Sequence, residues 1–141
     1  MTRSILVLHG PGTGTEAPAS AAKCCEDLGF ELKFHHSEDV DELCALIGQD
    51  TGSLAGLVIC PYAADSGSAA AMARYNDAIE AIANDQLPII ELHMQNIMAT
   101  ESLDTTPLNG PAGRMGMVCG LGETGYQLAI GSIARKSGQV A

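Results

Sequence analysis

The chain has 141 residues and a mass of 14.6 kDa, so residues 1–141 are expected to form a single domain. Seven Lys and Arg residues against 17 Asp and Glu residues give a formal net charge of −10, and a field of that sign repels nucleic-acid phosphates and anionic lipids. A hydrophobic fraction of 46% with 17% charged residues excludes a disordered chain. Because of the negative charge, we expect neither a nucleic-acid partner nor a membrane partner.

No apolar run reaches the roughly 20 residues that a membrane-spanning helix needs, and the first residues lack the apolar core of a signal peptide. These features predict a cytoplasmic protein. The five cysteines are odd in number, and the adjacent pair Cys24 and Cys25 fits neither a disulfide framework nor two CxxC metal knuckles. We expect reduced thiols, most of them small core residues.

Short β-branched and leucine-rich runs alternate with longer alanine-rich stretches, which is typical of βαβ units. Ser4–His9 is the first expected strand, and Pro18–Leu28 is the first helix, with the proline in its first turn. Phe30–His35 is the second strand, and its alternating polarity suggests a sheet edge. Ser37 can cap a helix that runs from Glu38 to about Gly48.

The middle of the chain carries the most apolar segment. Leu54–Cys60 (LAGLVIC) has the composition of a parallel strand that is covered on both faces, and we expect it at the centre of the sheet. A loop at Pro61–Gly67 leads into a long alanine-rich helix that continues through Ala83. Pro88–His93 (PIIELH) is the fourth strand.

The last third of the chain begins with Met94–Arg114, which we expect to be irregular. Gly116–Cys119 is the fifth strand, and the last helix runs from Thr124 to about Arg135. This order predicts an α/β protein with a doubly wound, five-stranded parallel sheet between two helix layers, in flavodoxin-like order. Ligands of such sheets bind outside the carboxyl ends of the strands, where the strand order reverses. The residues that follow the strands are therefore the candidates for function.

Glu91 and His93 lie two residues apart on the fourth strand, so their side chains leave the sheet on the same face. A carboxylate beside an imidazole stabilises the imidazolium and orients the ring, which is what a general acid needs. The other interpretation is that Glu91 is a buried polar group satisfied by backbone amides or by a neighbouring subunit. The spacing alone leaves both interpretations open.

Two further candidates follow the third strand. Cys60 ends that strand and is a candidate nucleophile or redox-sensitive thiol, although a packed thiol fits the same position. Tyr62 follows two residues later, and its phenol is a candidate for proton transfer, although it is equally suited to an exposed loop. The four histidines show no HxH or HExxH spacing and no cysteine pair complements them, so we expect no metal site.

Two glycine-rich segments also follow strands. Gly120–Gly125 (GLGETG) matches GxGxxG, but no further strand follows and Glu123 is the last carboxylate side chain. Glycines that let a helix pack closely on a strand explain this match better than dinucleotide binding. The first loop, Gly10–Gly14 (GPGTG), could hold an anion with backbone N–H groups, but it lacks the Lys-Ser/Thr ending of a P-loop.

Four segments, ILVLHGPG, GLVICP, IIELHMQNI and MVCGLGETGYQLAI, occur in the order in which they occur in the type II 3-dehydroquinate dehydratases, and the chain resembles that family over most of its length. The most specific segments are Glu-x-His-x-x-Asn-Ile at residues 91–97 and CGLGxxGY at residues 119–126. The resemblance implies a flavodoxin-like fold and a homo-oligomer, either a trimer or a dodecamer of four trimers. It also implies dehydration of 3-dehydroquinate to 3-dehydroshikimate without a metal or organic cofactor.

The same resemblance assigns roles to several residues. His93 falls on the general acid for the departing hydroxyl group, and Glu91 on the carboxylate associated with it. Met94 and Gln95 fall where backbone N–H groups hold the substrate carboxylate, with Gln95 in the place of a serine. We expect these two residues, together with Gly12 and Cys60, which take the places of two asparagines, to contact the ligand.

The chain departs from the family pattern in the first loop. In the family this loop is a long lid that begins GPN and carries an essential Arg and the Tyr that removes the proton from carbon. Here it is the shorter GPGTGTEA, with neither Arg nor Tyr. Ser66 replaces a His after the third strand, and Thr100 replaces an Arg after the fourth. His9 and Tyr62 are the candidate replacement bases.

Three functions are compatible with these residues. The first is a divergent family member that binds a small polar molecule, such as a carboxylate, and has weak or no dehydratase activity. The second is an active dehydratase that uses His9, Tyr62 or a group from another subunit as its base. The third is a structural or regulatory oligomer with an empty site.

Overall fold

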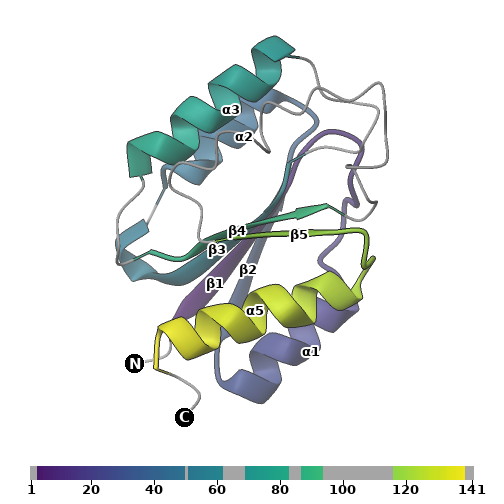
Figure 1. Ribbon diagram of the computed structural model, residues 1–141, viewed down its shortest axis with the longest axis vertical. Coiled ribbons are helices and arrows are strands. Elements are labelled where there is room, and N and C mark those ends of the chain that lie inside the picture. The colour runs from purple at the N-terminus through teal and green to yellow at the C-terminus, as the bar shows by residue number, and fades with distance from the viewer. Residues whose placement is uncertain (1–2, 50, 62–68, 83–86, 94–115, 139–141) are drawn as a thin grey trace.

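The computed structural model describes residues 3–49, 51–61, 69–82, 87–93 and 116–138. Five parallel strands form one sheet in the order β2-β1-β3-β4-β5, which confirms the predicted flavodoxin-like arrangement (Figure 1). The strands are β1 (Ser4–His9), β2 (Glu31–His36), β3 (Leu54–Cys60), β4 (Ile89–His93) and β5 (Gly116–Cys119).

Helices cover both faces of the sheet. Those in the described ranges are α1 (Ala19–Leu28), α2 (Val40–Ile47), α3 (Ala69–Ile82) and α5 (Thr124–Lys136), with a short 3-10 turn at Thr51–Ser53. Figure 1 shows α2 and α3 together on one face, and α1 and α5 together on the other. The expected irregular segment 94–114 lies outside the described residues.

Burial along the strands agrees with their places in the sheet. Every residue of β3, the central strand, is buried, whereas β2 is an edge strand whose residues are exposed or half-buried. Both positions agree with the prediction: the apolar composition of β3 indicated the centre of the sheet, and the alternation in β2 indicated an edge.

Alternation of side chains divides the core into two clusters. Ile5 and Val7 of β1 pack toward α1 and α5, whereas Leu6 and Leu8 pack toward α2 and α3. On β4, Ile90 and Leu92 belong to the first cluster and Ile89 belongs to the second. The same alternation decides which helix layer each polar residue at a strand end can reach.

Several predicted boundaries were wrong, among them the start of the fourth strand, which begins at Ile89 and not at Pro88. Pro18 is the N-cap of α1, with extended backbone, and does not lie in its first turn. The second strand begins at Glu31 and ends at His36, each one residue later than predicted. The helix after it is capped by Asp39, whose carboxylate accepts a hydrogen bond from the Asp41 N–H at 2.9 Å. Ser37 instead exchanges two 3.0 Å hydrogen bonds with the backbone of Asp39, and this turn delays the start of the helix.

The strand order reverses between β1 and β3, and the loops that follow these two strands are in close contact. The N–H of Gly10, directly after β1, donates to the carbonyl oxygen of Cys60 at 2.8 Å. A Cβ atom on Gly10 would overlap the carbonyl group of Pro61 and would lie 2.9 Å from a methyl carbon of Leu43. The loops after β1 and β3 therefore approach each other more closely than any side chain at position 10 allows.

We predict that Gly10→Ala lowers the free energy of unfolding by about 1–3 kcal/mol, because the backbone of Pro61 has to move to admit a methyl group. Chemical denaturation measures this change. Gly131→Ala is the matched control, because nothing lies within 4 Å of its added Cβ and it sits inside α5. The control should raise stability by about 0.5–1 kcal/mol. An equal change in the free energy of unfolding for the two variants would contradict the close approach of Gly10 to the Pro61 backbone.

Candidate active site

Glu91 and His93 form a hydrogen-bonded pair on β4, as their spacing suggested. Nε2 of His93 lies 2.7 Å from Oε1 of Glu91, and the two side chains are 2% and 0% exposed. Side chains alternate along β4, so Glu91 and His93 point to the same side of the sheet as Ile89. That side faces the α2 and α3 layer. Glu91 thereby fixes the orientation of the imidazole and can balance its charge when the ring is protonated.

A third residue, Tyr75, was not predicted to belong to this site. It lies on α3, is fully buried, and donates its hydroxyl proton to Oε2 of Glu91 over 2.7 Å. The two carboxylate oxygens of Glu91 thus have separate donors, one from a strand and one from a helix. Burial of a carboxylate is costly unless hydrogen bonds compensate it, so these contacts hold α3 against β4.

Cys119 lies on the same side of the sheet as the Glu91–His93 pair. It is the register partner of His93 on β5, and the N–H of Gly120 next to it donates to the His93 carbonyl oxygen at 3.0 Å. Burial raises the pKa of the Cys119 thiol, and the negative charge of Glu91 raises it further by a smaller amount. The thiol is therefore a neutral neighbour of the pair.

His9 belongs to a different group, on the opposite face of the sheet. Its Nδ1 lies 2.7 Å from the carbonyl oxygen of Gly14, so this nitrogen carries the proton. Nε2 of the neutral ring then accepts the hydroxyl proton of Tyr126 over 2.6 Å. Phe34 packs edge-on against the imidazole, with ring centroids 4.9 Å apart. His9 thus connects the first loop to α5.

The titration of both partners agrees with this assignment. Burial lowers the pKa of His9, the hydrogen bond to Gly14 opposes that change, and the nearby His36 lowers the pKa further. Burial raises the pKa of Tyr126, and the neighbouring Cys60 and Glu123 add to the effect. A neutral imidazole and a protonated phenol are the forms that this hydrogen bond requires.

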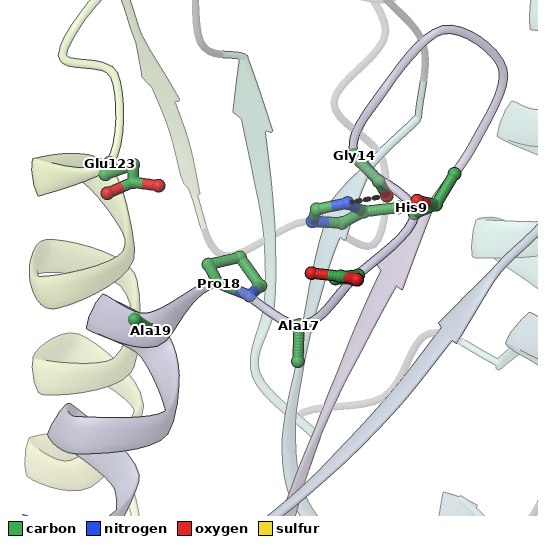
Figure 2. A pocket seen from close by; sticks show the side chains of 8 residues that line it. His9, Gly14, Ala17, Pro18, Ala19 and Glu123 are labelled. Carbon is green, nitrogen blue, oxygen red and sulfur yellow. Dashed lines mark hydrogen bonds between the residues drawn. The ribbon is translucent and has the colours of Figure 1, made fainter.

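A cavity of about 490 Å³ lies beside His9 and is lined by His9, Gly14–Ala19 and Glu123. Figure 2 shows the His9 ring facing the space between the first loop and the start of α1, with Glu123 of the α5 end across from it. Glu91 and His93 do not line this cavity. Among the predicted site residues, the structure brings Glu91 and His93 together and places His9 on the other face.

Cys60 lies on the His9 side, because the two are register partners and Cys60 follows the alternation of Val58. It is 1% exposed, and burial, with a further contribution from the charge of Glu91, raises its pKa to about 12. A thiol with such a pKa is almost entirely protonated near neutral pH, which favours a packed thiol over a nucleophile.

The two glycine-rich segments have structural roles. Gly120 and Gly122 adopt left-handed backbone angles after β5, and a Cβ on Gly125 would overlap a methyl group of Leu92. These glycines serve the turn and the close packing of α5 on β4. In the first loop, the exposed Gly12 donates its N–H to the Glu38 carboxylate at 2.9 Å, so a protein carboxylate already occupies this donor.

Five residues that the sequence analysis singled out lie outside the described ranges: Tyr62, Ser66, Met94, Gln95 and Thr100. Within the described part of the chain, no group of three or more His, Cys, Asp or Glu side chains could hold a metal ion. None of the helices in those ranges is both long and apolar enough to span a membrane.

Comparison with known proteins identifies the family. The model of the family described as dehydroquinase class II matches residues 6–134. This chain belongs to that family. A relative named 3-dehydroquinate dehydratase 2 from Pseudomonas aeruginosa is 32% identical, and the match covers 96% of this chain and 97% of the relative. A 3-dehydroquinate dehydratase from Mesorhizobium japonicum is also 32% identical, over 95% of this chain and 99% of its own length.

Solved structures show the same fold. A type II dehydroquinase from Propionibacterium acnes superimposes with a TM-score of 0.72 at 24% identity, covering 96% of this chain and 98% of the other. A 3-dehydroquinate dehydratase-like protein from Bifidobacterium longum gives a TM-score of 0.65, also at 24% identity, with the same coverage. The dehydroquinase class II family is a family of lyases in the shikimate pathway.

We predict that Cys60 resists alkylation in the native protein, because burial and a pKa of about 12 leave almost no thiolate. Iodoacetamide treatment near pH 8, followed by peptide mass spectrometry, should find Cys60 labelled more slowly than the half-buried Cys24. Both should react fully in denaturant. Rapid native labelling of Cys60 would restore the nucleophile or redox interpretation.

We predict that His9 makes the protein less stable in mild acid. Because burial lowers its folded-state pKa, the unfolded state binds more protons below about pH 6.5, so stability falls as the pH decreases through that window. Denaturation midpoints between pH 7.5 and 5 measure the slope. His9→Asn should make the slope shallower, whereas the matched change at exposed His35 should leave it unaltered. An unchanged slope in His9→Asn would contradict the assignment.

Proposed function

We propose that this protein binds a small carboxylate-bearing molecule at the carboxyl end of β4 and has at most weak 3-dehydroquinate dehydratase activity. The observation that carries the proposal is the hydrogen-bonded Glu91–His93 pair, which is combined with a first loop that has no tyrosine and no arginine. Membership of the dehydroquinase class II family, and the names of the relatives, support the choice of substrate.

In this proposal His93 performs the acid half of the dehydration. It donates a proton to the departing hydroxyl group, so that water leaves as the carbon–oxygen bond breaks. Glu91 holds the imidazole by its 2.7 Å hydrogen bond and balances the charge of the ring while it carries the proton. Met94 and Gln95, which follow directly on β4, are proposed to hold the substrate carboxylate with their backbone N–H groups.

The base half of the reaction lacks its usual groups. Removing a proton from carbon next to a ketone requires a positioned base, and a positioned acid or base typically contributes about 10²–10⁴-fold to the rate. The loop at residues 10–18 contains no phenol and no guanidinium to supply that base or to stabilise the charge that develops. Weak turnover is the expected result.

His9 is an unsuitable replacement base. Its side chain faces the α1 and α5 layer, whereas Glu91 and His93 face the α2 and α3 layer. The two ring nitrogens of His9 are hydrogen-bonded to Gly14 and Tyr126. Tyr62, outside the described residues, or a group from another subunit of a homo-oligomer remains as the proposed base in any active form.

A second candidate function is an ordinary 3-dehydroquinate dehydratase that takes its base from one of those sources. The observation that favours it is the level of identity, 32% over nearly the whole of two relatives named 3-dehydroquinate dehydratase. A third, non-catalytic role as a structural or regulatory oligomer would leave the Glu91–His93 pair as a buried structural contact. The rate of turnover separates the first two functions, and ligand binding separates both from the third.

We predict that the purified protein converts 3-dehydroquinate about 10²–10⁴-fold more slowly than the Pseudomonas aeruginosa relative assayed beside it, because the lid base is missing. The ultraviolet absorbance of the conjugated product measures the rate. His93→Ala should abolish the residual activity, whereas His35→Ala, at an exposed position, should retain it.

Turnover equal to that of the relative would contradict the loss of the base and establish the second function. If there is no turnover, thermal denaturation with a panel of small carboxylic acids decides between the remaining two. A rise in melting temperature that His93→Ala abolishes supports ligand binding at this site, because a ligand that binds only the folded state stabilises it. No shift with any acid would support the structural role.

A further inference from the structure

We propose that Tyr75 is a positioning residue for the acid half of the site. Its hydroxyl group holds the Glu91 carboxylate in the rotation that presents Oε1 to Nε2 of His93. The assignment rests on the proposed function, because it gives Tyr75 a role in how His93 transfers a proton. Tyr75 itself is not proposed to touch the substrate.

The geometry of the carboxylate carries this proposal. Tyr75 binds Oε2 and His93 binds Oε1, both over 2.7 Å. A carboxylate held at one oxygen can rotate about its last bond, whereas a carboxylate held at both oxygens is fixed in its plane. The hydrogen bond from Tyr75 therefore restricts the position of the atom that orients the imidazole ring.

Tyr75 is itself held firmly. It is fully buried in the cluster formed by α2, α3 and the strands, where Leu43, Ile47 and Ile79 are also fully buried. Close packing on this scale leaves a side chain little rotational freedom. The position of the phenol oxygen is thus set by the docking of α3 on the sheet, and the orientation of Glu91 depends on a helix remote from it in sequence.

Packing alone does not call for a hydroxyl group at this position. A phenylalanine ring would fill the same apolar surroundings, and a buried hydroxyl group costs free energy unless it is hydrogen-bonded. The partner that it finds is the carboxylate of the candidate acid pair. This is the arrangement expected where a neighbouring group locks a catalytic pair into one geometry.

The chain contains a matched control. Tyr126 is also fully buried and also donates its hydroxyl proton to a side chain, Nε2 of His9, but on the opposite face of the sheet. Tyr75→Phe and Tyr126→Phe therefore remove the same group at the same depth. Only the first of the two changes the surroundings of Glu91 and His93.

The test combines nuclear magnetic resonance with kinetics on the full chain. In protein labelled with 15N at histidine, the His93 Nε2–H signal reports the hydrogen bond to Glu91. Tyr75→Phe should weaken or shift that signal and alter the tautomer ratio of His93, whereas Tyr126→Phe should leave both as in the wild type. With 3-dehydroquinate, Tyr75→Phe should lower kcat by roughly 10–100-fold, the usual cost of misplacing a catalytic group, and leave KM nearly unchanged.

Each outcome is decisive. An unchanged His93 signal in Tyr75→Phe, or an equal change in Tyr126→Phe, would overturn the positioning role. If the wild type turns over no 3-dehydroquinate, the proposed activity fails, but the resonance comparison still tests the contact. If Tyr75→Phe does not fold, the test is made on the wild-type protein. A Tyr75 hydroxyl group that is hydrogen-bonded to Glu91 should give a slowly exchanging proton signal. Its absence, with the His93 Nε2–H signal present, would contradict the proposal.

Discussion

A side chain on a covered parallel strand can face only one of the two helix layers, and this constraint organises the polar residues of the protein. At the carboxyl end of β4, it directs Glu91 and His93 toward α3. At the end of β1, it directs His9 toward α5. Two histidines that both follow buried strands are therefore separated by the thickness of the sheet. A common acid–base mechanism for these two residues has no support in this arrangement.

Both polar groups are held by contacts between residues distant in sequence. Tyr75 on α3 reaches Glu91, and Tyr126 on α5 reaches His9 across 117 positions of the chain. In each case a tyrosine contributes its ring to a helix–sheet interface and its hydroxyl group to a polar side chain at the strand end. The two helix layers are thereby fixed at the edge of the sheet where ligands of this fold bind.

Much of the architecture could be predicted from the sequence because buried strands have a strong local signature. The apolar run of β3 and the alternation of β2 fixed their places at the centre and edge of the sheet. The spacing of Glu91 and His93 predicted a shared face, since that depends on the pleat of one strand. Tyr75 could not be found in this way, because a tyrosine in an amphipathic helix has the pattern of a core residue. Its partner, Glu91, is brought within hydrogen-bonding distance only by the packing of α3 on the sheet. The cap at Asp39 was missed for a local reason: Ser37 is also a good N-cap residue, and only the turn that it makes with Asp39 moves the start of the helix.

The two halves of the proposed reaction depend on the fold to different degrees. Glu91 is fully buried, so removing His93 or Tyr75 leaves a charge without one of its donors and lowers stability whether or not the protein is an enzyme. The loop after β1 is partly exposed, and a tyrosine or arginine there could be gained or lost at little cost to folding. Folding stability thus depends on the Glu91–His93 pair directly, whereas it depends little on which side chains the loop after β1 carries. The fold therefore accounts for the geometry of the Glu91–His93 pair, whereas in the proposed function the composition of the surrounding loops determines whether a substrate is turned over.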